Sequence, residues 1–137
     1  MEFLTSSPYD VAFQTQLEAI APGLSGLLAQ ADTLPAPVAH QAIAALLGRA
    51  CQAQHIRNIE LGHEAAAEMP RLWLVREIEA VAARTLNLHD EWEFRRLLEL
   101  YQFLNPQLLS RLIAQGLQSR NPEIAGAARE FSQGVLD

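Results

Sequence analysis

Prolines divide this sequence into segments of helical length. Asn105-Pro106 and Asn121-Pro122 each place a capping side chain before a proline, and proline fits the first turn of a helix. Pro70 suits the same first-turn position. Because a proline inside a helix breaks it, each of these positions separates two elements. With Ser7-Pro8 and a capping box at Asp90 and Glu93, they predict helices over residues 9–20, 38–52, 56–69, 72–86, 91–104, 106–119 and 122–133.

The composition favours helices over strands. Hydrophobic residues make up 50% of the chain and aromatic residues only 7%, so the core must be mainly Leu, Ala, Ile and Val. Ala and Leu are strong helix formers, and the β-branched runs typical of strands are missing. We therefore expect a single all-α domain over residues 1–137. Residues 1–36 are expected to form an N-terminal cap of helices and residues 37–137 the body, with a proline-rich linker over residues 34–37 at the boundary.

The helices of the body repeat with a regular period. Their openings at Pro37, Pro70 and Pro106 lie 33 and 36 residues apart, and each is followed by one helix and then a second. The second helices of the last two units also align by residue type, with Tyr101 matching Phe131. This period with two helices per unit is typical of an α-solenoid, whose units stack to bury their apolar faces.

One junction between helices carries a family resemblance. The segment Arg120-Asn121-Pro122-Glu123-Ile124, followed by Ala127-Ala128, resembles the junction between the helices of HEAT-type repeats. Residues 90–100 are similar but more divergent, the likeness extends over residues 70–133, and residues 37–69 share only the helix spacing. The resemblance implies a short HEAT-like α-solenoid of about three helix pairs. It also implies a protein-binding scaffold, without naming a partner.

Both tryptophans fall outside the main apolar stripes of their helices. Over residues 91–104 the expected core face excludes Trp92, Arg96 and Phe103, and over residues 72–86 it excludes Trp73 and Arg76. Two interpretations remain open: these aromatic residues pack against an adjacent helix, or they form an exposed patch of aromatic and arginine side chains. Such residues are enriched where proteins bind one another. We therefore predict the five residues as partner-binding residues.

The charge of the chain excludes some partners and favours others. Net charge is −6, all ten basic residues are Arg, and the first of them is Arg49. Nucleic-acid binders need clustered positive charge, which is missing here, so we expect no nucleic-acid partner. Glu60, Glu64 and Glu68 form an acidic stripe at helical spacing, which is either a solvated face or a docking strip for a basic protein.

The sequence contains no strong catalytic or metal-binding motif. Glu60-x-x-His63 has the spacing of a ferritin-like metal ligand pair, but no second Glu-x-x-His exists, so we expect no metal and interpret His63 as a surface histidine. Cys51 is the only cysteine and is expected to be a small buried side chain. Neither a nucleophile elbow nor a phosphate-binding loop is present, and no cofactor is expected.

These patterns lead to one functional hypothesis and one alternative. The hypothesis is a protein-binding helical-repeat module without catalytic activity, such as an adaptor or an inhibitor of the immunity-protein type, with a protein partner that is basic. The alternative is a homodimeric helical bundle with a small-molecule or enzymatic pocket between its helices. The apolar runs are too short for a membrane helix, so a cytoplasmic protein without a membrane partner is expected. The Ala-rich, Arg-only composition is typical of GC-rich bacterial genomes.

Overall fold

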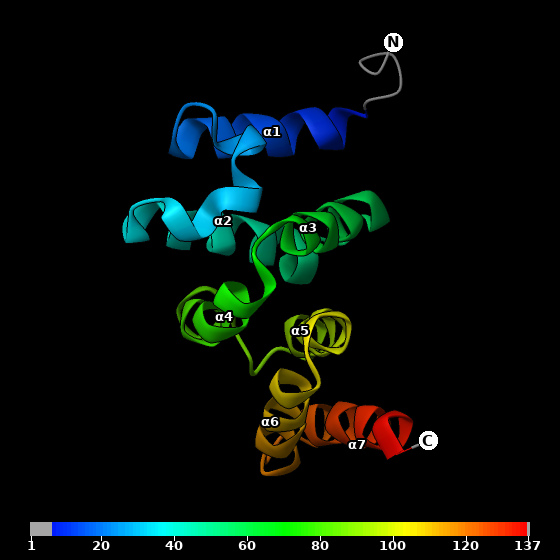
Figure 1. Cartoon of the computed structure of the whole chain (residues 1–137). Coiled ribbons are helices and arrows are strands. Elements are labelled where there is room, and N and C mark those ends of the chain that lie inside the picture. Colours follow the sequence, from blue (N-terminus) through cyan, green and yellow to red (C-terminus); the bar gives the residue numbers. More distant parts are fainter. Residues whose placement is uncertain (1–6, 137) are drawn as a thin grey trace.

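The described part of the chain, residues 7–136 in a computed structural model, consists of helices joined by short loops and turns (Figure 1). No strand occurs within these residues, which confirms the expected all-α class. Short 3-10 turns, η2 (Leu24–Gly26) and η3 (Leu28–Thr33), follow the first helix, and a π turn, η4 (Gly48–Gln52), follows the second. The α-helices are α1 (Pro8–Ile20), α2 (Ala36–Leu47), α3 (Ile56–Glu68), α4 (Arg71–Thr85), α5 (Glu91–Leu104), α6 (Pro106–Leu117) and α7 (Pro122–Leu136).

The helices begin where the capping signals predict. The Asn105 side chain accepts hydrogen bonds from the backbone N–H groups of Gln107 and Leu108, and it opens α6. Asp90 opens α5 by accepting from the N–H of Glu93 at 3.0 Å. The expected capping box is only half formed. The Glu93 carboxylate accepts a hydrogen bond from the backbone N–H of Asn87, also at 3.0 Å, instead of one from the backbone N–H of Asp90.

Several helix ends differ from the prediction: α6 ends at Leu117 instead of residue 119, α7 extends to Leu136 instead of residue 133, and both ends of α2 change. The helix begins at Ala36, inside the expected linker, because Pro37 is accommodated in its first turn. The helix expected over residues 38–52 ends at Leu47 and continues as the π turn η4. Gly48 at this point has low helix propensity, and η4 is held by the helices around it, with Ala50 and Cys51 fully buried. The expectation of a buried Cys51 is confirmed.

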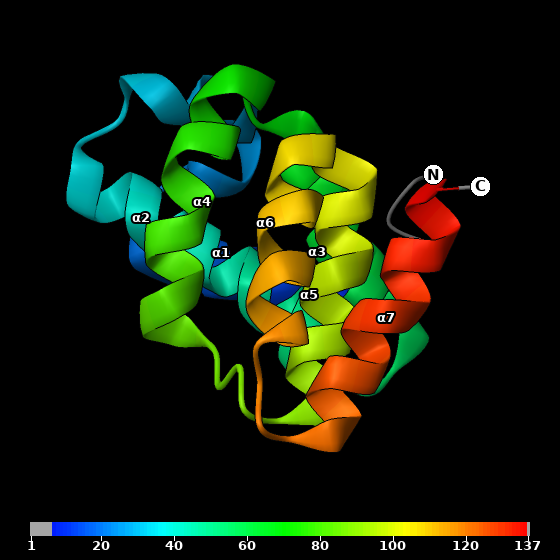
Figure 2. The ribbon, with the colours of Figure 1, turned by 90° about the horizontal axis from the view of Figure 1, so that it is seen from below.

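The helices are arranged in successive tiers. Figure 1 shows α1 at one end, followed by α2 beside α3, then α4 beside α5, and finally α6 beside α7. Seen from below, α2 and α4 lie on one side and α3, α5 and α7 on the other (Figure 2). Direct contacts join α2 to α4, α3 to α5 and α5 to α7. Among the described residues, no helix has the length and apolar character needed to cross a membrane.

The core runs continuously through these tiers and consists mainly of Leu, Ala and Ile. Helix α5 lies near its centre and contacts η4, α3, α6 and α7. Its predicted core face is confirmed, because these residues are all buried: Phe94, Leu97, Leu98, Tyr101 and Leu104. Leu100 is buried as well, so α5 is covered over a wider arc than one apolar stripe.

Two glycines allow elements to approach one another closely. A Cβ added at Gly62 of α3 would stand 2.5 Å from the backbone nitrogen of Ala50 in η4. One added at Gly116 of α6 would meet the ring of Phe94 at the same distance. Since real Cβ atoms do not approach other atoms so closely, these two crossings depend on the absence of a side chain.

An ion pair joins α1 to α3. The Arg57 guanidinium binds Asp10 through two hydrogen bonds, of 2.9 Å from Nε and 2.7 Å from Nη2. These bonds to Arg57, with a further one from the hydroxyl of Ser7, hold the pKa of the Asp10 carboxyl well below its usual range.

Gly62→Ala is expected to lower the free energy of unfolding by about 2 kcal/mol, because the added methyl group meets rigid backbone instead of a side chain that can move. Gly126→Ala, which lies within α7 with an open environment, is expected to raise it by up to about 1 kcal/mol through helix propensity. Urea unfolding measures both. Equal stability of Gly62→Ala and the wild type would show that α3 and η4 do not touch at this point.

Asp10→Asn is expected to destabilise the protein at pH 7 by about 1 kcal/mol, since it removes the charge paired with Arg57. A carboxyl whose pKa is depressed in the folded state stabilises that state above its unfolded pKa of about 3.9. The difference in the free energy of unfolding between Asp10→Asn and the wild type should therefore be constant above about pH 5. It should become smaller as the pH falls below about 4. Thermal unfolding across this range measures it, with Asp32→Asn, an exposed carboxylate on η3, as the control. A difference that does not change with pH would contradict the ion pair.

Candidate functional site

A groove of about 450 Å³ runs between α3 and α5. It is open to solvent, and its walls combine apolar and acidic side chains. Every lining residue comes from one of these two helices, so the groove exists only because the helices lie next to each other. The lining residues are Ile59, Glu60, His63, Glu64, Ala67, Glu99 and Phe103.

Phe103 is the exposed aromatic residue of this groove. The residue is 45% exposed, although Leu100, Tyr101 and Leu104 beside it on α5 are buried. The ring leans against the imidazole of His63, with 5.6 Å between the ring centroids. The Arg71 guanidinium lies 5.8 Å from the same ring and donates a 2.9 Å hydrogen bond to the carbonyl of Leu104. Phe103 is therefore held in place while much of its surface faces solvent.

His63 is not the surface histidine that the sequence suggested. Its side chain is partly buried between α3 and α5, and its Nε2 atom has no hydrogen-bond partner among the described residues. Burial lowers the pKa of His63, opposed in part by the charge of Glu99. The imidazole is therefore neutral at pH 7 and does not offset the carboxylates of the groove.

The acidic stripe of α3 is exposed, and an internal arginine organises it. Arg57 Nη1 lies 2.7 Å from the Glu64 carboxylate and 3.3 Å from that of Glu60, while the same guanidinium binds Asp10. Glu68, one turn further along α3, forms no ion pair with any described residue. Arg57 thus fixes the position of two of the three carboxylates and neutralises only part of their charge.

A second, smaller groove lies on the other side of α3. It has a volume of about 280 Å³ and is formed by α1, η2, η3 and α3. Glu64 borders both grooves, and Glu68 borders the second. The stripe of glutamates is therefore a ridge between two grooves. The lining residues of the second groove are Asp10, Phe13, Gln14, Leu17, Ser25, Leu28, Leu61, Glu64, Ala65 and Glu68.

Trp92 and Arg96 lie together at the other end of α5. The guanidinium of Arg96 stacks 4.1 Å from the Trp92 ring and binds Glu99 at 2.7 and 2.8 Å. The indole N–H of Trp92 donates a 3.2 Å hydrogen bond to the carbonyl of Ala53, just after η4. With 38% of its side chain exposed, Trp92 combines the two open interpretations: one part packs against the adjacent element, and another part faces solvent.

Trp73 and Arg76 are placed apart from the other three predicted residues. Both lie on α4, which belongs to the other side of the stack (Figure 2). Trp73 agrees with the packing interpretation, because it is half-buried against the core. Helix α4 packs against α2, so the apolar stripe that it needs is wider than the one read from the sequence. Arg76 is exposed.

No family model, curated protein or solved structure matches the chain. Within residues 7–136, no three His, Cys, Asp or Glu side chains gather in an arrangement that suits a metal ion. The functional assignment therefore rests on the α3–α5 groove and its surroundings.

Sequence reasoning missed three residues of this site: Arg57, His63 and Glu99. Arg57 lies within one helical turn of Glu60 and two of Glu64, and this spacing signals ion pairs on one helix face. Glu99 carried the same signal, because Arg96 lies three residues before it on α5. His63 carried none, because the ring it meets, Phe103, lies on another helix.

Trp92→Ala is expected to lower the free energy of unfolding by about 2 kcal/mol, because the indole packs between α5 and the end of η4 and donates a hydrogen bond there. Phe103→Ala is expected to cost less than about 1 kcal/mol, since that ring is more exposed and has no polar group to satisfy. Guanidinium unfolding of the two variants tests this ranking. The reverse order would make Phe103 the structural residue and leave Trp92 free for a partner.

Proposed function

We propose that this protein is a non-catalytic, protein-binding module built from HEAT-like helical repeats, acting as an adaptor or an inhibitor. The single observation that carries the proposal is the open α3–α5 groove with Phe103 exposed on its wall. An aromatic side chain that is fixed by its neighbours and still faces solvent loses little entropy when a partner covers it.

The arrangement of the helices supports the repeat interpretation. Helices α2 and α3, α4 and α5, and α6 and α7 follow one another in tiers, in the chain order that a repeat of helix pairs would have (Figure 1). Stacked helix pairs present extended surfaces lined by one set of equivalent helices, and such surfaces commonly bind proteins. Helices α3, α5 and α7 would supply that surface here.

The shape of the groove favours a protein-binding surface over a small-molecule or enzymatic pocket. A small-molecule or enzymatic site normally encloses most of its ligand in a concave, largely apolar cavity. The α3–α5 groove is open along its length, and its acidic side chains stand at the rim beside an aromatic residue. Trp92, which stacks with Arg96, lies nearly three helical turns from Phe103 on the same face of α5, so the exposed aromatic surface extends beyond the groove.

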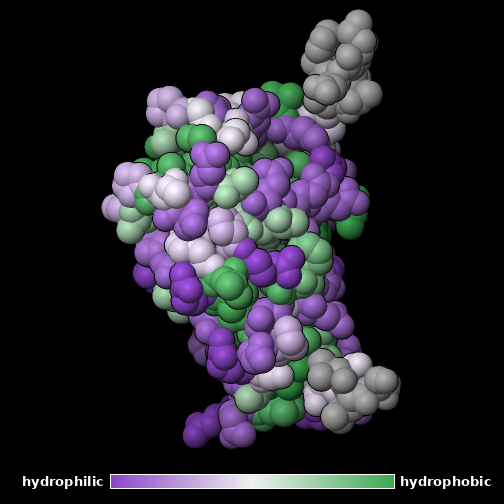
Figure 3. Space-filling view, viewed as in Figure 1, coloured by the Kyte–Doolittle hydropathy of each residue, from purple (hydrophilic) through white to green (hydrophobic). Residues whose placement is uncertain are grey.

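Hydrophobic areas are limited in size on the face of the molecule that Figure 3 shows. On this face they lie scattered among hydrophilic areas. A partner would therefore be recognised by a few apolar contacts surrounded by charged ones, which is the usual anatomy of a non-obligate interface. This fits an adaptor or an inhibitor that exists both free and bound.

Capture of partners by the tagged protein from its source cells, followed by mass spectrometry, tests this function. A partner recovered with the wild type should be lost with Phe103→Ala and retained with Leu117→Ala, whose side chain on α6 is similarly exposed at 43%. With purified components, Phe103→Ala should weaken binding at least about tenfold. If both variants retain the partner equally, the groove is not its binding site. Recovery of the protein alone, as a dimer, would favour the homodimeric alternative.

A further inference from the structure

We infer that the grooves on either side of α3 receive a basic segment of a partner protein, with an apolar side chain of that segment in the α3–α5 groove beside Phe103 and its Arg or Lys side chains on the glutamate ridge of α3. This inference rests on the proposed function and adds the chemistry of the partner. The ridge is defined by Glu60, Glu64 and Glu68.

The first argument is geometric. The ridge separates two grooves that both contain apolar side chains: Ile59, Ala67 and Phe103 on one side, and Leu17, Leu28 and Leu61 among others on the other side. A segment that crosses α3 would therefore place apolar side chains into a groove and pass its polar side chains over the carboxylates. An amphipathic segment with both kinds of side chain matches this alternation.

The second argument is charge. Five carboxylates line the two grooves, and the neighbouring guanidiniums are already bound within the protein. Arg57 pairs with Asp10, Glu60 and Glu64, and Arg96 pairs with Glu99. Arg71 donates to the neutral carbonyl of Leu104 and keeps its positive charge, so five carboxylates against these three guanidiniums still leave a negative surplus. His63 adds no positive charge while it is neutral. The carboxylates that can bind Arg or Lys side chains of a partner are the five that line the grooves: Asp10, Glu60, Glu64, Glu68 and Glu99.

The same charge argues against other occupants. A second copy of this chain carries a net charge of −6, and its ten arginines offer no basic cluster to match the ridge. Phosphate backbones and anionic lipid surfaces would be repelled. A basic protein segment is the occupant whose charge complements both grooves.

The two parts of the site should act on different rate constants. Exposed ion pairs contribute little affinity, but complementary charge accelerates encounter and makes it sensitive to salt. The apolar side chain buried against Phe103 should instead determine how slowly the complex dissociates. The charge and the aromatic anchor can therefore be tested separately.

The test begins with a displayed library of random peptides selected on the wild-type protein. Selected peptides are expected to combine Arg or Lys with a large apolar residue, and their binding should disappear with Phe103→Ala. Selection of acidic or uncharged sequences would overturn the inference, and so would the absence of any peptide that binds through the groove. A Phe103-dependent dimer in sedimentation would identify a second copy as the occupant and would overturn it as well.

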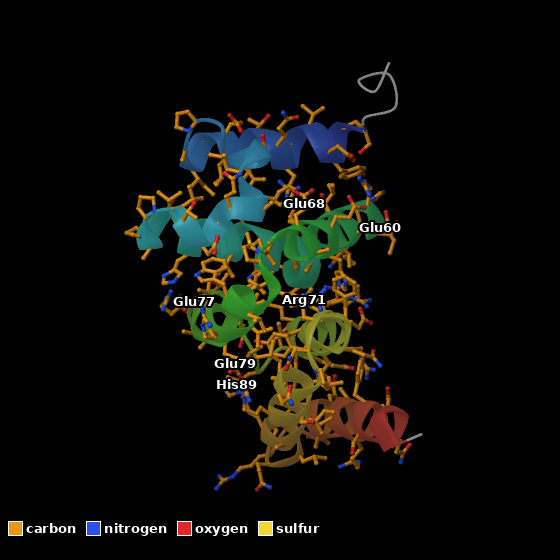
Figure 4. All side chains as sticks on the ribbon, viewed as in Figure 1. Glu60, Glu68, Arg71, Glu77, Glu79 and His89 are labelled. Carbon is orange, nitrogen blue, oxygen red and sulfur yellow. The ribbon has the colours of Figure 1, made fainter. Side chains whose placement is uncertain are left out.

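Surface plasmon resonance with a selected peptide completes the test. The double variant Glu60→Gln, Glu68→Gln leaves the Asp10–Arg57–Glu64 contacts intact and should slow association at least about threefold and weaken its salt dependence, with dissociation nearly unchanged. The double variant Glu77→Gln, Glu79→Gln is the control, because it removes the same two charges from α4 on the other side of the stack (Figure 4). Equal association rates for the two variants would refute the role of the ridge. A cellular partner that depends on Phe103 but not on the ridge would leave the proposed function standing without this inference.

Discussion

The close contact between Gly62 of α3 and the backbone of Ala50 in η4 is the constraint on which the rest of the site depends. Because Gly62 has no side chain, α3 can lie directly against the π turn. The residues that follow Ala50 then meet α5: Gln52 donates to Glu93 at 3.1 Å, and the carbonyl of Ala53 accepts from Trp92. The turn thus links α3 to α5, and the spacing between these helices defines the groove.

Ion pairs within the protein allow the acidic surface of α3 and α5 to keep fixed side-chain positions. Carboxylates at helical spacing repel one another, which lowers the stability of an isolated helix. Here Arg57 lies among them and binds Glu60, Glu64 and Asp10 at once, so repulsion is reduced where α1 and α3 meet. Arg96 does the same for Glu99 on α5. The fold therefore keeps a surplus of negative charge on one face without a destabilising number of unpaired carboxylates.

Much of the helical architecture was predictable, whereas the site was predictable only in part. The asparagine and aspartate caps and the buried face of α5 follow from interactions within a few residues, and they were read correctly. Phe103 was also identified as lying outside the core stripe. The failures occurred where a distant element intervened: α3 and α5 pack around η4, where the expected helix gives way to a π turn, and α5 covers His63.

The sequence by itself determined the all-α class, the positions at which most helices begin, the acidic character of the chain and the face on which Trp92 and Phe103 stand. These properties depend on spacings of one to four residues, for which helix geometry is known in advance. Only the tertiary structure decided that His63 meets Phe103 and that the glutamates of α3 stand between two grooves. His63 and Phe103 are forty residues apart in the chain, and their contact depends on how closely the intervening elements pack, which local periodicity does not encode.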